Sequence, residues 1–158
     1  SMTEEHLRWI RGRLAAGKTI LELGSGAGTA HLCKSWTVYS VEHDAKYVGL
    51  YHDRYIRAPI VDGWYDVRVL EAYIPPSYDL LIIDGPPGRI GRRSFLKHLD
   101  LFDLDVPVLI DDTHRTQERK LAEALATILG RDPQKFVCAD GRSFTILDVG
   151  PPEIDDEE

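Results

Sequence analysis

Short apolar runs alternate with segments of helical periodicity along most of the chain, and this alternation limits the fold more than any other feature. Strands are predicted at 19–23, 37–41, 56–61, 79–83 and 106–110. Helices are predicted around 7–14 and at 29–34, 45–54, 64–72, 92–102 and 116–129. Two final runs, 135–139 and 143–149, flank a tight turn and predict a hairpin. The pattern predicts an α/β, Rossmann-like, doubly wound sheet of seven strands, mostly parallel with an antiparallel C-terminal hairpin.

The length of 158 residues is enough for one domain with a substantial core. Ser1 stands before Met2 and resembles a remnant of tag removal, so we expect the domain to span 2–150. No apolar run approaches the roughly 18 residues that a membrane span needs, and the charged N-terminus lacks an apolar signal segment. Two isolated cysteines suggest a reducing compartment, so the sequence predicts a cytoplasmic protein.

Acidic residues are concentrated at the C-terminus. The last six residues hold five of the 26 acidic residues, and we expect 151–158 to be a disordered tail. The remaining 21 acidic residues nearly balance 19 basic ones. This balance argues against a nonspecific nucleic-acid partner.

A glycine-rich turn follows the first predicted strand in the segment LELGSGAGT. Gly24, Gly26 and Gly28 would let the backbone pass close to a ligand. The dinucleotide fingerprint G-x-G-x-x-G fails because its third glycine would fall on Thr29. The pattern that fits is E-x-G-x-G-x-G, beginning at Glu22. A turn that merely joins a strand to a helix is the alternative.

An acidic residue, Glu42, closes the second predicted strand. A carboxylate at the tip of this strand can accept hydrogen bonds from both hydroxyls of a ribose. The alternative is a solvated acidic residue in a turn. The position therefore favours a nucleoside-containing ligand.

Together, the glycine turn and Glu42 resemble the class I S-adenosylmethionine (SAM)-dependent methyltransferases, across about residues 18–150. The resemblance implies SAM as cofactor, with Glu42 on its ribose and Asp62 near the adenine amino group. His43 would lie beside the adenine, and Trp64 or Tyr65 would cover its face, although an exposed turn histidine and core aromatic residues are the alternatives. The cofactor-binding residues implied are Glu22, Gly24, Ser25, Gly26, Gly28, Glu42, His43, Asp62, Trp64 and Asp84.

Carboxylates also follow two later apolar strands, in the segments IIDGPPG and VLIDDTHR. If these strands are neighbours, Asp84, Asp111 and Asp112 crowd one small volume. A divalent cation such as Mg²⁺ or Mn²⁺ would relieve their repulsion, provided the chain turns at the Asp-Asp pair. In the alternative, Asp112 caps a helix and Asp84 contacts the amino group of SAM.

The same residues resemble the metal-dependent O-methyltransferases that act on sugars, and the plant glucuronoxylan methyltransferases, over residues 84–115. The resemblance implies a metal on Asp84, Asp111 and Asp112. No lysine follows Asp84 at the position where the catechol-type enzymes carry their base. Asp84 and His114 are therefore the candidate catalytic residues, and a histidine bonded to a strand-end backbone group is the alternative for His114.

Basic residues cluster after the Gly-Pro-Pro-Gly turn. Arg89, Arg92, Arg93 and the later Arg115 would suit an anionic substrate, such as a uronate or a phosphorylated sugar. A solvated helix face is the alternative.

These features lead us to expect SAM-dependent, divalent-metal-dependent O-methylation of a sugar or polysaccharide hydroxyl. The alternatives are an RNA or nucleobase methyltransferase and a non-catalytic SAM-fold scaffold. Because so short a chain leaves little sequence for a lid, we expect an open acceptor site, or one completed by a partner subunit or a second copy.

Overall fold

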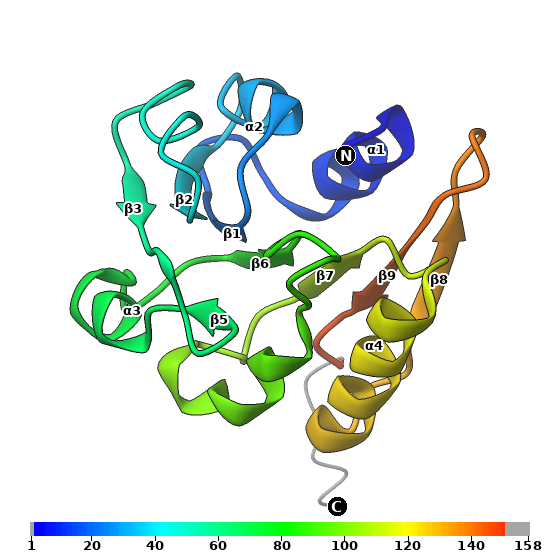
Figure 1. Ribbon diagram of the computed structural model, residues 1–158. Helices are drawn as coiled ribbons and strands as arrows, with labels where there is room; N and C mark the ends of the chain where they lie inside the picture. The colour runs from blue at the N-terminus through cyan, green and yellow to red at the C-terminus, as the bar shows by residue number, and fades with distance from the viewer. Residues whose placement is uncertain (1, 151–158) are drawn as a thin grey trace, which may run out of the picture.

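A seven-stranded sheet forms the centre of the computed structural model, which describes residues 2–150 (Figure 1). Its strands are β1 (Thr19–Leu23), β2 (Thr37–Glu42), β3 (Tyr55–Arg57), β6 (Leu80–Ile83), β7 (Val108–Asp111), β8 (Gln134–Val137) and β9 (Ser143–Leu147). The strand order is β3-β2-β1-β6-β7-β9-β8. All neighbours are parallel except β9, which is antiparallel to both β7 and β8. The fold class predicted from the sequence is confirmed.

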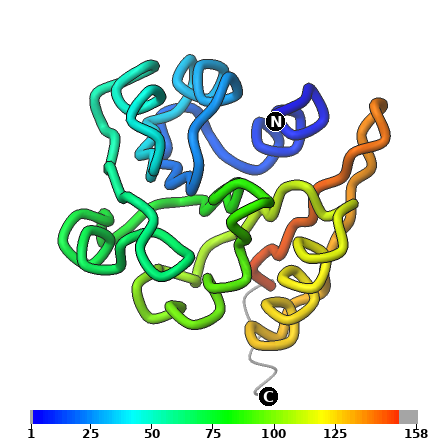
Figure 2. Tube along the Cα trace, viewed as in Figure 1, coloured from blue at the N-terminus to red at the C-terminus, as the bar shows by residue number. Residues whose placement is uncertain are grey.

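Helices cover both faces of this sheet. They are α1 (Glu4–Arg13), α2 (Ala27–Leu32), α3 (Val67–Tyr73) and α4 (Thr116–Leu129), with 3₁₀ helices at Arg93–Lys97 (η1) and Leu99–Leu101 (η2). Figures 1 and 2 show α1 and α2 on one face, and α3, the 3₁₀ segment and α4 on the other. Because successive strand residues point to opposite faces, Ile20 and Leu80 pack with the first layer, and Leu21 and Leu81 with the second.

The residues of the expected acidic tail, 151–158, lie outside the described part of the chain. Within the described part, no helix combines the length and apolarity that crossing a membrane would require.

The segment between β2 and α3 differs from the sequence expectation. No helix forms at 45–54: the chain makes successive turns there, and Gly49 has a positive φ of 78° that a right-handed helix excludes. The strand expected at 56–61 is interrupted at Pro59, which lacks an amide donor. Its second half becomes β4 (Ile60–Val61), which forms a small separate hairpin with β5 (Trp64–Tyr65).

An Asp-Gly turn closes this small hairpin. Asp62 and Gly63 have φ values of 53° and 80°, the left-handed conformation that two-residue hairpin turns require. The helix expected to begin at 64 therefore begins at Val67. Asp66 caps it by accepting a hydrogen bond from the amide of Arg68.

The helix expected at 92–102 is instead the pair of 3₁₀ helices, and β7 ends at Asp111 rather than at 110. The helix predicted at 116–129 has those bounds, and Gly130 ends it in the left-handed conformation. The register of β7 matters for the site, because it makes Asp111 the last residue of the strand.

A buried carboxylate anchors the glycine turn to the sheet. Glu22 lies on β1 and is 4% exposed. It accepts hydrogen bonds from the hydroxyl of Thr29 on α2, at 2.7 Å, and from that of Ser40 on β2, at 2.9 Å. Burial raises the pKa of Glu22 to about 7 even though these hydroxyl bonds lower it. Glu22 thus joins the α2 end of the turn to β1 and to the neighbouring strand β2, and its carboxyl favours the protonated form.

We predict that Glu22 lowers the free energy of unfolding as the pH rises. The folded state holds the proton of Glu22 up to about pH 7, whereas the unfolded chain releases it near 4.5. Stability is therefore lost as the pH rises through this window, by up to about 3 kcal/mol. Glu22→Gln, a neutral isostere, should remove this loss in urea denaturation at pH 5, 6, 7 and 8.

Other groups also titrate, so the informative quantity is the difference between the two proteins. Glu123→Gln, an exposed change on α4, serves as the control and should follow the parent protein. If the curves for the parent protein and Glu22→Gln run parallel, the raised pKa of Glu22 is wrong.

Candidate functional site

A cleft of about 300 Å³ opens where the carboxyl ends of β1, β2 and β6 meet. Its lining includes Gly24, Ser25, Glu42, His43, Tyr65, Asp84 and Arg89. The strand order reverses at this edge, because β2 and β6 flank β1 on opposite sides. Doubly wound sheets bind their ligands at this kind of switch point.

Two glycines let the ends of β1 and β6 approach each other. Gly24 has a φ of 95°, and a Cβ there would lie 2.7 Å from the carbonyl oxygen of Asp84. A Cβ on Gly85 would overlap the hydroxyl of Tyr65. Side chains at either position would push the cleft walls apart, so both glycines are required by shape.

The carboxylate of Glu42 is held rigidly in the wall of the cleft. It is 4% exposed and accepts hydrogen bonds from the amides of Ser25, at 3.0 Å, and Asp44, at 2.7 Å. The Nδ1 atom of His43 lies 3.1 Å from the same carboxylate. A carboxylate has about four acceptor positions, so Glu42 can still accept hydroxyl donors from a ligand.

The hydroxyl of Tyr65 is buried and has no hydrogen-bond partner among residues 2–150. Buried polar atoms are rarely left unpaired, and this atom belongs to a residue that lines the same cleft. A bound polar ligand would supply the missing partner. Together with the glycine walls and Glu42, Tyr65 makes the cleft suitable for a nucleoside-containing cofactor.

The other implied cofactor residues divide into two groups. Gly26 and Gly28 lie on the far side of the turn and, with Glu22 and Asp84, line a second cavity of about 160 Å³. Asp62 and Trp64 line a separate pocket of about 490 Å³ on the small hairpin. The structure does not bring this second pair to the cleft lining, because Asp62 is in the hairpin turn and Trp64 stacks on His98. Of the two aromatic residues that the sequence suggested for the adenine, Tyr65 is the one that lines the cleft.

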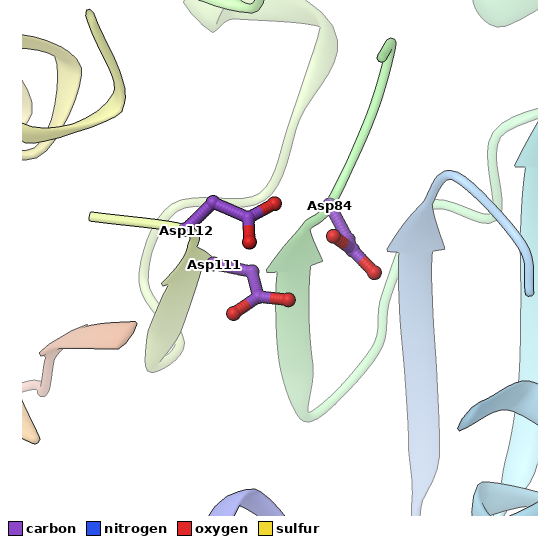
Figure 3. Close-up of side chains that lie close together, drawn as sticks. All are labelled: Asp84, Asp111 and Asp112. Carbon is purple, nitrogen blue, oxygen red and sulfur yellow. The ribbon is translucent and has the colours of Figure 1, made fainter. Parts of the chain in front are cut away.

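Three carboxylates converge at the ends of β6 and β7 (Figure 3). Asp84 follows β6, Asp111 ends β7, and Asp112 has a φ of 61°. This left-handed residue supplies the turn that brings the Asp-Asp pair to the same side. One oxygen from each of the three side chains lies within 4.8 Å of the others. The crowding predicted from the sequence is therefore present.

A buried arginine, Arg92, contacts this cluster from the loop after β6. Its Nη2 atom is 3.1 Å from an oxygen of Asp112 and 3.6 Å from one of Asp84. Its side chain is only 4% exposed, so the expectation that Arg92 contacts the substrate does not fit its position. The strand-end carboxylates bind it inside the protein.

The other three predicted substrate arginines are more accessible. Arg89 lines the same cleft as Glu42, and Arg93 is exposed at the start of η1. The half-exposed side chain of Arg115 lies 3.6 Å from Asp112 and 4.0 Å from Glu118. Arg89 and Arg115 therefore place cationic groups near Asp84 and Asp112, respectively.

The structure adds His6 of α1 to the site, which the sequence interpretation missed. Its Nε2 atom lies 2.8 Å from Asp111, and its Nδ1 atom accepts a hydrogen bond from the amide of Thr3. An Nδ1 acceptor fits the neutral tautomer that donates from Nε2. The ring also stacks on Phe144, with 4.1 Å between centroids. Thr3 and His6 form the capping box of α1, and this spacing was the available sequence signal.

The surroundings move the pKa values of two carboxyls in opposite directions. Burial raises the pKa of Asp84 well above its usual value, and the charge of Asp111 raises it further. Burial is the largest single influence on Asp111 and would raise its pKa, but the hydrogen bond from His6, the charge of His6 and smaller contributions together lower that pKa. Asp111 is thus the fixed anion, and Asp84 is the carboxyl that binds a proton more readily.

The second candidate base, His114, is exposed. Its Nδ1 atom accepts a hydrogen bond of 3.3 Å from the amide of Ser143, at the start of β9. This is the backbone-bonded arrangement that the sequence left open as the alternative.

Carboxylate oxygens are the donors that Mg²⁺ prefers, and their spacing here is compatible with a shared ion. The neighbouring residues are less suited to a metal ion, because Arg92 already binds Asp112 and His6 already binds Asp111. A divalent ion would have to share these carboxylates with a buried guanidinium. The residues present therefore do not fit a metal while Arg92 holds this position.

Comparisons with known proteins agree on the fold. No protein-family model and no curated protein matches the chain. Among solved structures, a methyltransferase from Pyrococcus furiosus is 17% identical, with a TM-score of 0.60 over 93% of this chain and 82% of the other. The METTL16 methyltransferase domain is 14% identical, with a TM-score of 0.56 over 96% of this chain and 71% of the other.

The methyltransferase MycE of the mycinamycin biosynthetic pathway, solved with Mg and S-adenosylhomocysteine (SAH), is 18% identical, with a TM-score of 0.55. That alignment covers 93% of this chain but only 44% of MycE. At these identities the likeness concerns the fold alone. The chain therefore has the Rossmann-like fold of the class I SAM-dependent methyltransferases.

Proposed function

We propose that this chain is a SAM-dependent methyltransferase that transfers the methyl group to a hydroxyl of a sugar or polysaccharide. One observation carries the proposal: Asp84 lines the cofactor cleft and also belongs to the acidic cluster at the ends of β6 and β7. A carboxylate in this position can serve both the cofactor and an acceptor hydroxyl beside it. MycE, solved with SAH, supports this class of cofactor.

The cleft residues have distinct parts in cofactor binding. Glu42, already held by two backbone amides, would accept the ribose hydroxyls. The unpaired hydroxyl of Tyr65 would gain a polar partner, and the Gly24 turn would let the backbone lie against the ligand. When bound, SAM supplies an electrophilic methyl group on a sulfonium.

Asp84 is the group that would take the proton of the acceptor hydroxyl. It is placed at the boundary of the two sites, and its raised pKa makes it a better proton acceptor than an ordinary aspartate. His114 remains the alternative base, although its Nδ1 atom is engaged with Ser143. The protein would otherwise act by alignment, holding the hydroxyl oxygen in line with the methyl group.

The arginines around the cluster favour an anionic acceptor. Arg89 in the cleft wall and the half-exposed Arg115 could both pair with a uronate carboxylate.

We expect an open acceptor site, or one completed by a second subunit. The free thiols Cys33 and Cys138 suit the reducing cytoplasm suggested by the sequence. RNA methylation and a non-catalytic scaffold are the rival outcomes of the tests below.

We predict that Glu42→Ala weakens the binding of SAM and SAH by at least about tenfold, because the ribose loses two charge-assisted hydrogen bonds. Calorimetric titration measures this affinity. Glu123→Ala, an exposed acidic residue on α4, is the matched control and should bind as the parent does. A thermal melt of each variant verifies the fold, and unchanged affinity in folded Glu42→Ala would refute this cofactor site.

We predict that Asp84→Asn lowers the rate of methyl transfer by at least about a hundredfold, the usual contribution of a general base. Formation of SAH from SAM, with glucuronate-containing oligosaccharides as acceptors, gives the rate. The fall in kcat should exceed any loss of SAM affinity. Asp105→Asn, an exposed change before β7, should leave both unaffected.

If Asp84→Asn retains full activity, Asp84 is not the base. Methylation of RNA but of no oligosaccharide would favour the RNA alternative. Cofactor binding without transfer to any acceptor would favour the scaffold.

A further inference from the structure

We infer that the guanidinium of Arg92 is the resident cation of the acidic cluster, in the position that a divalent metal would otherwise occupy, so the site needs no metal. The part of this inference that concerns methyl transfer rests on the proposed function. The part that concerns cation binding rests only on the contacts of Arg92 with the ends of β6 and β7.

Arg92 joins the same two segments that a shared metal ion would join. On the β6 side, its Nε atom donates to the carbonyl of Pro86 at 2.9 Å, and its Nη2 atom donates to that of Asp84 at 3.2 Å. On the β7 side, its Nη1 atom donates to the carbonyl of Asp111 at 3.2 Å, and its Nη2 atom donates to the carboxylate of Asp112 at 3.1 Å. The planar fork of an arginine suits such a bridge.

The charges of the cluster support this assignment. Three carboxylates lie close together, and two of them, Asp84 and Asp112, are within 4 Å of Arg92. The third, Asp111, receives a hydrogen bond from His6. Each carboxylate therefore has a protein partner, and the half-exposed Arg115 adds a second positive charge beside Asp112.

A divalent ion would compete directly with Arg92. An ion bound to the same oxygen of Asp112 would lie within about 5 Å of the guanidinium, where like charges repel strongly. Movement of Arg92 out of the way would break its bonds to three backbone carbonyls and expose a side chain that is now 4% accessible. Buried acceptors left without donors are costly. The arrangement therefore selects the internal cation.

The test measures cation binding without any cofactor or acceptor. Electron paramagnetic resonance measures the binding of added Mn²⁺ up to millimolar concentration. The parent protein and Asp111→Asn should give the same result, because we expect no Mn²⁺ to bind at the acidic cluster of the parent protein. The melting temperature of the parent protein should be the same in EDTA and in Mg²⁺. Arg92→Met removes the charge but keeps much of the volume, so we expect a lower melting temperature that Mg²⁺ partly restores, together with new Mn²⁺ binding.

Arg93→Met is the matched control, because Arg93 is the exposed neighbour on the same segment, and its melting temperature and Mn²⁺ binding should equal those of the parent protein. Arg92→Lys keeps the charge and should bind no Mn²⁺, which covers the case in which Arg92→Met does not fold. Saturable Mn²⁺ binding to the parent protein that Asp111→Asn abolishes would overturn the inference. So would an Arg92→Met variant as stable as the parent.

A separate measurement connects the inference to the reaction. Methyl transfer by the parent protein should persist unchanged in EDTA, and a loss that Mn²⁺ restores would overturn metal independence. If no acceptor is found, the proposed function fails, but the Mn²⁺ and melting results still decide whether Arg92 is the resident cation.

Discussion

Parallel pairing of β1 with β6 and of β6 with β7 brings three strand ends to one edge of the sheet, and the site depends on this alignment. The carboxyl ends of such strands place whatever follows them close together. Gly24 follows β1 and Asp84 follows β6, and their backbones nearly touch. The cleft and the acidic cluster therefore share a wall, and Asp84 is that wall.

Crowding carboxylates at a buried edge creates a charge problem that the rest of the site answers. Arg92 comes from the loop after β6 and His6 from α1, so distant segments supply the partners of Asp112 and Asp111. The partners are unequal: the carboxylate of Asp84 lies 3.6 Å from Arg92, whereas that of Asp112 lies 3.1 Å from it. Burial raises the pKa of Asp84, and the charge of Asp111 raises it further, so this carboxyl is available for proton transfer.

The sequence predicted the parts of this structure that follow from local pattern. The alternation of strands and helices predicted the sheet, and the acidic residues at the strand ends predicted that Asp84 lies close to Asp111 and Asp112. It failed where one residue overrode a pattern, as Pro59 did by dividing a strand. It also failed where contacts join distant segments: the basic cluster suggested that Arg92 contacts a substrate or lies on a solvated helix face, and His6 was not identified. The burial of both residues depends on tertiary packing.

The most direct test of this account is a crystal structure of the protein soaked with SAH. We predict that the ribose hydroxyls lie within hydrogen-bonding distance of Glu42, that the homocysteine part lies along Gly24 and Asp84, and that the hydroxyl of Tyr65 gains a polar partner. Another pocket, of about 410 Å³ and lined by Tyr39, Arg57 and Tyr73 on the β3 edge, offers a clear alternative position. SAH bound there, with the Glu42 cleft empty, would contradict the account.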